Sequence, residues 1–224
     1  MTSLRSGVRA TQSPQDPNVT LLAAAHPERP GPDWASIALK VFGPTLTGSR
    51  LTLRSPHLRD IPLFRRWLAD PEVARYWWTR DVPWARRPAL AAVVLFIGGL
   101  RPDVILWTIA HEGKPIGHCL IRKIDRARRQ ATAAILIGER AAQGKGFAAE
   151  AMAIRNQFVF DRLHLETLTA TALAANVASH RVLEKSGYRL VGVAAGGALV
   201  AGRREDLMLF ELTRTDYARV STMG

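Results

Sequence analysis

The sequence predicts an α/β domain built on a mixed (α+β) sheet that is flanked by helices. Two observations lead to this prediction. From Ser49 onward, segments with the two-residue alternation of strands are interspersed with segments that have helical spacing of apolar residues. The 224 residues are 47% hydrophobic and 22% charged, which suits one globular domain with an appendage. We therefore expect one domain over residues 49–214.

The two ends of the chain are expected to lie outside this domain. Residues 1–33 hold five of the 13 prolines and show no periodic apolar face, so they are predicted to form a flexible tail. Residues 34–48 are expected to form a short segment that docks before the first strand. Residues 215–224 are interpreted as a C-terminal tail.

The first half of the domain is expected to contain a strand, two helices and a three-stranded meander. Residues 50–54 alternate like a strand, and residues 57–69 have helical spacing up to Asp70 and Pro71. A second helix is expected from 83 to 100. The meander is predicted as strands at 104–110, 115–123 and 131–138, joined by turns at 111–114 and 126–130.

The second half is expected to alternate helices with strands. Gly146 is predicted to open a helix that runs to residue 163, and Gly187 to end a helix that spans 176–186. Strands are predicted at 166–171, 188–193 and 206–212.

Charge and cysteine content limit the classes of partner and compartment. Lysine and arginine number 31 against 19 acidic residues, a net charge of +12, which suits either an anionic partner (nucleic acid or a phosphate-rich cofactor) or a solvated basic surface. The single cysteine, Cys119, excludes a disulfide scaffold and a multi-cysteine zinc site. The longest apolar stretch, 89–100, is shorter than the roughly 20 residues of a membrane span. We therefore expect a cytoplasmic protein without a metal or a membrane partner.

A glycine-rich loop gives the strongest chemical signal. Residues 143–148 read Gln-Gly-Lys-Gly-Phe-Ala and lie between a predicted strand and a predicted helix. Glycines let consecutive backbone N–H groups turn toward one point, and the helix N-terminus adds partial positive charge, so such a corner binds a pyrophosphate. The loop matches neither the Walker A nor the GxGxxG pattern. A plain glycine turn that enters a helix is the alternative.

A second motif, downstream of the first, favours a pyrophosphate-binding loop over a plain glycine turn. Residues 137–152 (IGERAAQGKGFAAEAM) and 176–188 (NVASHRVLEKSGY) together resemble the GNAT superfamily of acetyl-CoA-dependent N-acetyltransferases. The resemblance is closer to the Rim-type branch, which acetylates ribosomal-protein N-terminal alanines, and spermidine acetyltransferases stand nearby. It covers roughly residues 49–214 and implies the GNAT-like acyl-CoA N-acyltransferase fold.

The resemblance also implies where acetyl-CoA binds and which residue protonates the coenzyme A thiolate as it leaves. Backbone amides around Leu136 and Ile137 would hold the acetyl carbonyl. Asn176 would contact the pantetheine arm, and Ser179 would protonate the leaving thiolate. For both, a helix cap is the alternative, with Asn176 as the N-cap itself. The pyrophosphate would lie on the amides of six loop residues: Gln143, Gly144, Lys145, Gly146, Phe147 and Ala148.

The sequence indicates the general base and the acceptor amine less clearly than the acetyl-CoA site. Many relatives carry a glutamate where Thr132 stands, and neither Glu139 nor His118 can be assigned in its place. An α-amine, with a pKa of about 7.7–8.0, needs less help in losing a proton than a lysine-like amine at about 10.4, so we expect a protein N-terminal α-amine. Four aromatic residues, which could line the acceptor site or pack in the core, are Tyr76, Trp77, Trp78 and Trp84.

Other functions stay open at this point. The tryptophan pair at 77–78 resembles that of aminoglycoside acetyltransferases, and a polyamine acceptor or a silent acyl-CoA sensor are further alternatives. The basic turn with Arg126, Arg128 and Arg129 permits ribosome or RNA contact, although no stacking aromatic motif accompanies it. The sequence gives no oligomeric state.

Overall fold

The structure is a computed structural model. It describes residues 43–76, 102–200 and 202–222. The predicted tail over 1–33, residues 34–42 of the docking segment, the helix expected at 83–100, and Trp77, Trp78 and Trp84 lie outside the described residues. Among the helices that are described, none is long and apolar enough to cross a membrane.

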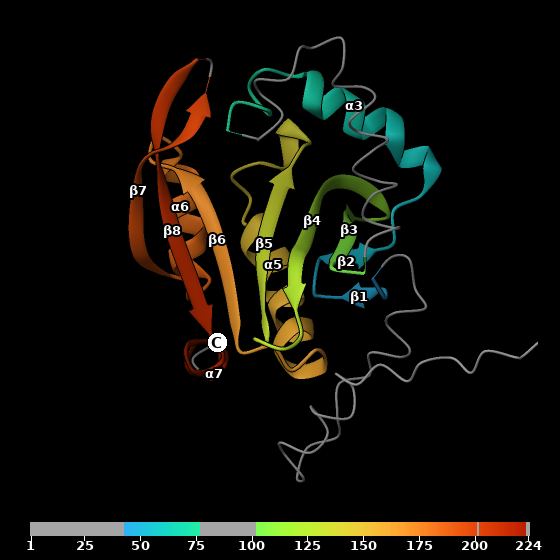
Figure 1. Cartoon of the computed structure of the whole chain (residues 1–224). Helices are drawn as coiled ribbons and strands as arrows, with labels where there is room; N and C mark the ends of the chain where they lie inside the picture. The colour runs from blue at the N-terminus through green and yellow to red at the C-terminus, as the bar shows by residue number, and fades with distance from the viewer. Residues whose placement is uncertain (1–42, 77–101, 201, 223–224) are drawn as a thin grey trace, which may run out of the picture. The chain divides into compact units, whose positions relative to one another are not determined.

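Strands and helices follow the predicted order, with additions at the N-terminal and C-terminal ends (Figure 1). The strands are β1 (Leu46–Thr47), β2 (Leu51–Arg54), β3 (Val104–His111), β4 (Lys114–Asp125), β5 (Gln130–Ile137), β6 (Thr167–Leu173), β7 (Arg189–Val200) and β8 (Arg203–Thr213). The helices are η1 (Leu58–Asp60), α3 (Ile61–Ala69), η3 (Arg140–Ala142), α5 (Phe147–Gln157), η4 (Phe158–Arg162), α6 (Val177–Lys185) and α7 (Arg214–Ser221).

The eight described strands form one sheet in the order β1-β2-β3-β4-β5-β6-β8-β7. All neighbouring strands run antiparallel except β5 and β6, which are parallel. The mixed sheet predicted from the sequence is therefore confirmed.

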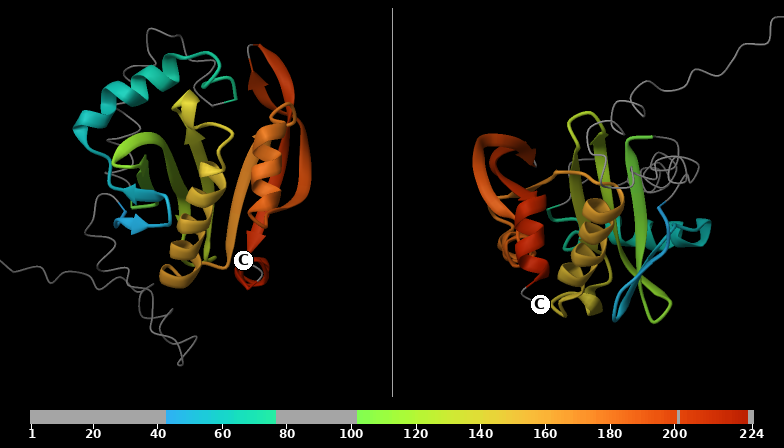
Figure 2. Two further views of the ribbon diagram at one scale, coloured as in Figure 1. Left: turned by 180° about the vertical axis from the view of Figure 1, so that it is seen from behind. Right: turned by 90° about the horizontal axis from the view of Figure 1, so that it is seen from below.

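Strand alternation assigns the helices to opposite faces of this sheet. On β4, Cys119 and Ile121 join a core cluster with Met152 of α5 and Leu183 of α6. The intervening Leu120 joins a second cluster with the α3 side chains. α5 and α6 thus cover one face, as the view from behind shows (Figure 2), and α3 packs on the other.

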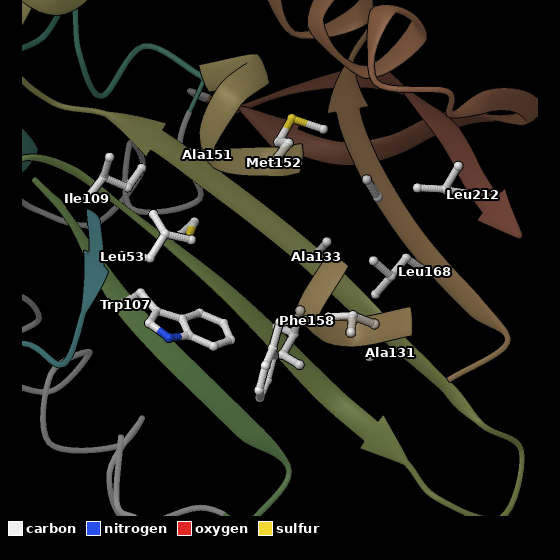
Figure 3. Packing of buried hydrophobic residues seen from close by; sticks show 14 of the residues in the cluster. Leu53, Trp107, Ile109, Ala131, Ala133, Ala151, Met152, Phe158, Leu168 and Leu212 are labelled. Carbon is white, nitrogen blue, oxygen red and sulfur yellow. The ribbon is translucent and has the colours of Figure 1, made fainter. Parts of the chain in front are cut away.

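The larger cluster has aromatic side chains at its centre. The rings of Trp107 on β3 and Phe158 meet edge to face with centroids 5.6 Å apart. Ala151 and Met152 of α5 lie close to the sheet in the same cluster (Figure 3). Small residues on β5, Ala131 and Ala133, leave room for the helix to approach the strands.

The helix predicted from 146 to 163 changes its winding at residue 158. α5 ends at Gln157, and the next five residues form the π-helix η4, in which Leu163 N–H donates to the Phe158 carbonyl at 3.1 Å. The wider turn buries three consecutive apolar residues, 158–160, which a regular helix would spread around its circumference.

Three elements differ from the sequence expectation. β1 is an additional strand within the expected docking segment, and β7 runs to Val200 rather than to 193. Within the expected tail over 215–224, residues 214–221 form α7. Thr213 caps this helix, because its hydroxyl oxygen accepts from the Asp216 N–H at 3.2 Å and its O–H donates to the Asp216 carboxylate at 2.6 Å.

Candidate active site

β5 and β6 separate after three paired positions, the last of which is Thr132 with Thr169. At that pair the two threonine hydroxyls lie 3.0 Å apart. Each strand then continues with its other neighbour, β5 with β4 and β6 with β8 (Figure 1). From residue 133 onward, the edge of β5 that faces β6 has no strand partner within the described residues. Backbone polar groups along this edge that do not bond to side chains are therefore available to a ligand. We call this place, 133–137 of β5 and 170–173 of β6, the β5–β6 opening.

Both helices of one face begin beside this opening. Parallel strands end at the same edge of a sheet, so the connections that leave β5 and β6 start from that edge. The connection after β5 is the loop 138–146, which leads into α5, and the connection after β6 is 174–176, which leads into α6. The topology thus brings the predicted pyrophosphate loop and the predicted Asn176–Ser179 segment to one edge of the sheet.

The loop before α5 has the backbone geometry that its glycines allow. Gly144 and Gly146 have φ of 74° and 80°, in the left-handed region that side chains disfavour. Gly146 is the N-cap of α5 and supplies no side-chain acceptor, so the first amides of this helix remain open to an anion. Gln143 Nε2 donates to the Ile137 carbonyl at 3.0 Å and fastens the loop to the end of β5.

Arg50, which the sequence analysis did not single out, lies at the same helix end. Its Nε donates to Glu150 Oε2 at 2.7 Å, its Nη1 donates to the Lys145 carbonyl at 3.3 Å, and its guanidinium stands 4.7 Å from the centroid of the Phe147 ring. Burial opposes ionisation of Glu150, but the Arg50 backbone N–H and guanidinium hold the pKa of that carboxyl below its ordinary value. These contacts join residues about 100 apart in sequence, so no local pattern could reveal them.

Asn176 and Ser179 form the first turn of α6. Asn176 Oδ1 accepts from the Ser179 N–H at 3.2 Å, which is the geometry of an N-cap. The amide group of Asn176 keeps its Nδ2 donor, so capping does not exclude contact with a ligand. The Ser179 hydroxyl makes no hydrogen bond to the described residues, and its side chain is half-buried.

His180 adds a further tie that sequence reasoning missed. Its Nε2 lies 3.0 Å from the Leu173 carbonyl, at the end of β6, and its ring centroid is 5.5 Å from that of Phe210. Because a carbonyl oxygen only accepts, this contact needs the proton on Nε2 and leaves Nδ1 as an acceptor. His180 therefore fixes the start of α6 against the sheet.

Known proteins resemble this chain in sequence. Residues 50–189 match the family described as acetyltransferase (GNAT) domain. This chain belongs to that family. The N-acetyltransferase p20 of Bacillus licheniformis is 28% identical over 177 residues, which are 78% of this chain and 98% of p20. The GNAT match confirms the resemblance inferred from the two motifs.

Solved structures share the fold. RimJ of Mycobacterium smegmatis, in complex with CoA-disulfide, superposes with a TM-score of 0.72 at 22% identity and covers 83% of this chain and 97% of its own. Spermidine N-acetyltransferase of Vibrio cholerae, in complex with CoA and spermine, has a TM-score of 0.66 at 20% identity, with 76% and 99% covered. At these identities the likeness concerns the GNAT fold.

No general base emerges among the described residues of this GNAT domain. The Glu139 carboxylate forms an ion pair with Arg66 of α3, and Thr132 is bonded to Thr169. His118 is 3% exposed on the α3 face, where its ring meets that of Phe64 at 5.2 Å, and burial lowers its pKa to about 4. An imidazole with this pKa is neutral at pH 7 and takes up a proton poorly.

α3 is held against the start of the loop 138–146, which contains the predicted pyrophosphate site. A Cβ at Gly138 would stand 2.1 Å from Cδ2 of the buried Trp67, so only glycine permits this contact. Asp70 pairs with Arg140 at 3.8 Å beside it. Of the four aromatic residues expected around the acceptor, only Tyr76 is described; it follows α3 and is 36% exposed.

Cys119 and metal ligands take no part in the described site. Burial raises the pKa of the Cys119 thiol to about 12, although the Arg155 charge opposes this rise, so the thiol is protonated and inert at pH 7. In the portion of the chain that is described, no group of three His, Cys, Asp or Glu could hold a metal ion.

Proposed function

We propose that this GNAT domain transfers the acetyl group of acetyl-CoA to a primary amine, and that this amine is a protein N-terminal α-amine. The observation that supports the donor most directly is the β5–β6 opening, with two helix N-termini at its edge. An extended thioester arm can add hydrogen bonds to the unpaired edge of β5, in the manner of an added strand.

The residues around the opening fit the chemical groups of coenzyme A. The uncapped start of α5 and the glycines 144 and 146 present amides without side chains in the way, which suits a pyrophosphate. Leu136 and Ile137 lie on the open stretch of β5, where their peptide groups are candidates to bind the acetyl carbonyl. The Asn176 Nδ2 donor is available to an amide carbonyl of the pantetheine arm.

Direct transfer needs no acyl-enzyme. The amine nitrogen bonds to the thioester carbonyl carbon, the carbon–sulfur bond breaks, and its electron pair passes to sulfur. The amine loses one proton to water and the thiolate gains one, so the reaction is neutral overall. Ser179 is the proposed donor to the departing thiolate, because its hydroxyl has no other hydrogen bond within the described residues, and water returns a proton to its oxygen.

The acceptor assignment rests on the three candidate positions for a general base, 132, 139 and 118, none of which offers an available base. Glu139 is paired, Thr132 stands at the separation point, and the buried His118 is a weak base. A lysine-like amine would need strong help to lose its proton, whereas an α-amine is often already neutral. The net charge of +12 also disfavours polycationic acceptors.

A polyamine acceptor is the second candidate, because the spermidine acetyltransferase structure has a similar fold. A thiol-release assay with acetyl-CoA separates the two. We expect turnover with peptides that have a free N-terminus and none with the same peptides acetylated at the N-terminus but carrying an internal lysine. Turnover with spermidine or an aminoglycoside alone would reject the α-amine. Tight coenzyme binding without turnover on any amine would indicate an acyl-CoA sensor instead.

A further inference from the structure

Three polar side chains are buried together between α5 and the sheet. Two of them belong to α5, and the third belongs to the residue that precedes β7. Arg155, Asn156 and Tyr188 are 1%, 2% and 2% exposed. Arg155 donates to Asn156 Oδ1 from Nε at 3.2 Å and from Nη2 at 2.9 Å, and Nη2 also donates to the Tyr188 hydroxyl at 3.0 Å. Its Nη1 donates to the Ala134 carbonyl at 3.4 Å. Within the described residues, every oxygen that accepts from Arg155 is uncharged.

Among the described residues, no carboxylate lies within ion-pair distance of the buried Arg155 guanidinium. An arginine side chain stays protonated in proteins, and burying a charge without a counter-ion is strongly unfavourable. The Arg155 charge acts on the Cys119 thiol of β4 and on the Tyr188 hydroxyl, and burial raises the pKa of both groups, that of Cys119 to about 12. Both are neutral at pH 7. Apolar replacements of buried ionic groups are often neutral or stabilising, so burial of the Arg155 charge is weak evidence for a role in stability.

The position of this charge relates it to the β5–β6 opening. Ala134 is the second β5 residue beyond the last pair with β6, so Arg155 bonds to the stretch of strand whose other edge is open. Tyr188 directly follows the helix–glycine segment that ends α6. The hydrogen bonds of Arg155 thus join the unpaired part of β5 to the residue that follows the end of α6. They lie on the face of the sheet that α5 and α6 cover.

We propose that Arg155 is a positioning residue whose charge favours the anions formed during acetyl transfer at the β5–β6 opening, an inference that rests on the proposed function. When the amine nitrogen bonds to the carbonyl carbon, negative charge develops on the carbonyl oxygen and then on sulfur as the carbon–sulfur bond breaks. A fixed cation in a low-dielectric site stabilises these anions more than the neutral thioester. Arg155 is too buried to touch the substrate and acts through its field and the Ala134 peptide.

The decisive measurement is the pKa of the coenzyme A thiol when it is bound to the protein. We expect this pKa to lie below that of free coenzyme A, measured by the pH dependence of alkylation with iodoacetamide and mass analysis of the coenzyme. The protein's single cysteine does not interfere, because Cys119 is buried and its pKa is about 12. If Arg155 had a purely structural role, the thiol pKa would not depend on the charge of residue 155.

Variants then assign the shift to this side chain. Arg155→Met should raise the bound thiol pKa by about one unit and lower kcat about tenfold, with little change in KM for acetyl-CoA. Arg155→Lys retains the charge and should keep the low thiol pKa, as should Tyr188→Phe. Arg162→Met, which removes an equal charge from an exposed side chain of η4, serves as the control.

Two results would overturn the inference. A wild-type bound thiol with a pKa equal to or above that of free coenzyme A would do so without any variant, so the test survives a variant that fails to fold. A folded Arg155→Met protein with unchanged thiol pKa and kcat would do so as well. If calorimetry finds no binding of coenzyme A to the wild-type protein, the proposed function itself fails. If the coenzyme binds and the pKa of its thiol is unchanged, only the role proposed for Arg155 is wrong.

Discussion

Gly146 opens α5 with φ of 80°, and a Cβ there would meet only Arg50 Nη2, at 3.7 Å. The space would accept a side chain, so the need for glycine comes from the backbone conformation. A branched residue would force the loop into another geometry and turn its amides away from a common point. At the scale of single residues, the candidate site therefore depends on backbone angles as much as on side chains.

We expect Gly146→Val to weaken coenzyme A binding at least tenfold, about 1.4 kcal/mol. Isothermal calorimetry measures this loss. Gly202→Val is the matched control, because Gly202 has φ of 76° with no atom within 4 Å of its Cβ position and lies in the β7–β8 turn. It should bind the coenzyme as the wild type does. Unchanged affinity in a folded Gly146→Val protein would remove the pyrophosphate site from this loop.

We expect substitution of Ser179 to affect the reaction rate and substitution of Asn176 to affect stability. Ser179→Ala should lower kcat about 10²–10⁴-fold, as loss of a proton donor does, with coenzyme affinity nearly unchanged. Its melting temperature should hold, since the hydroxyl caps nothing. Asn176→Ala should lower the free energy of unfolding by about 0.5–2 kcal/mol, because it removes the N-cap of α6.

Steady-state kinetics and thermal melts on both variants test this division. If Ser179→Ala turns over near the wild-type rate, water rather than Ser179 protonates the thiolate.

At the scale of elements, a buried carboxylate joins η1 and α3 to the sheet. Asp60 is 1% exposed and accepts from Arg54 Nη1 at 2.7 Å and Nη2 at 2.9 Å, as well as from the His57 N–H and the Thr108 hydroxyl. Burial alone would raise the pKa of Asp60, but these hydrogen bonds and the Arg54 charge lower it below its ordinary value. The ionised form is therefore the one that stabilises the fold.

Because of Asp60, the free energy of unfolding should decrease as the pH is lowered. Its pKa is lower in the folded than in the unfolded state, so its stabilisation is full above about pH 4 and is lost as the pH falls through the folded-state value. We expect Asp60→Asn to lower the free energy of unfolding by about 3 kcal/mol at pH 7, because it leaves Arg54 without its partner.

Urea unfolding from pH 7 to pH 3 measures this effect. The difference between wild type and variant should shrink toward the acid end. A difference that is constant over this range would show that the Asp60 charge contributes nothing.

At the scale of the whole molecule, the composition of residues 1–33 separates them from the domain. Their prolines and polar residues offer too little apolar surface to offset the entropy of ordering. We expect a chain that starts at residue 34 to keep the melting temperature and the turnover of the full chain. Differential scanning calorimetry and the thiol-release assay on both chains check this. A large loss of either would show that the segment contributes to the domain.

The sequence by itself determined the order of elements and the two motifs. Alternation and helical spacing are local patterns, and so the strands 104–110 and 131–138 and the start of α5 at Gly146 were predictable. The same holds for Asn176, whose cap spans three residues. It did not predict α7, although the Thr213–Asp216 cap is also local, because the short apolar pattern of that segment is weak.

Tertiary structure alone decided what surrounds the motifs. The β5–β6 opening exists because, beyond Thr132 and Thr169, β5 stays paired only with β4 and β6 only with β8, and Arg50, Glu139 and Arg155 find partners on distant segments or other elements. Ion pairs and buried networks form between residues that are far apart in sequence, where no periodicity records them. The motifs therefore indicated the family and the coenzyme. Only the packed chain shows that Glu139 is paired, that His118 is buried, and that Arg155 has no carboxylate partner among the described residues.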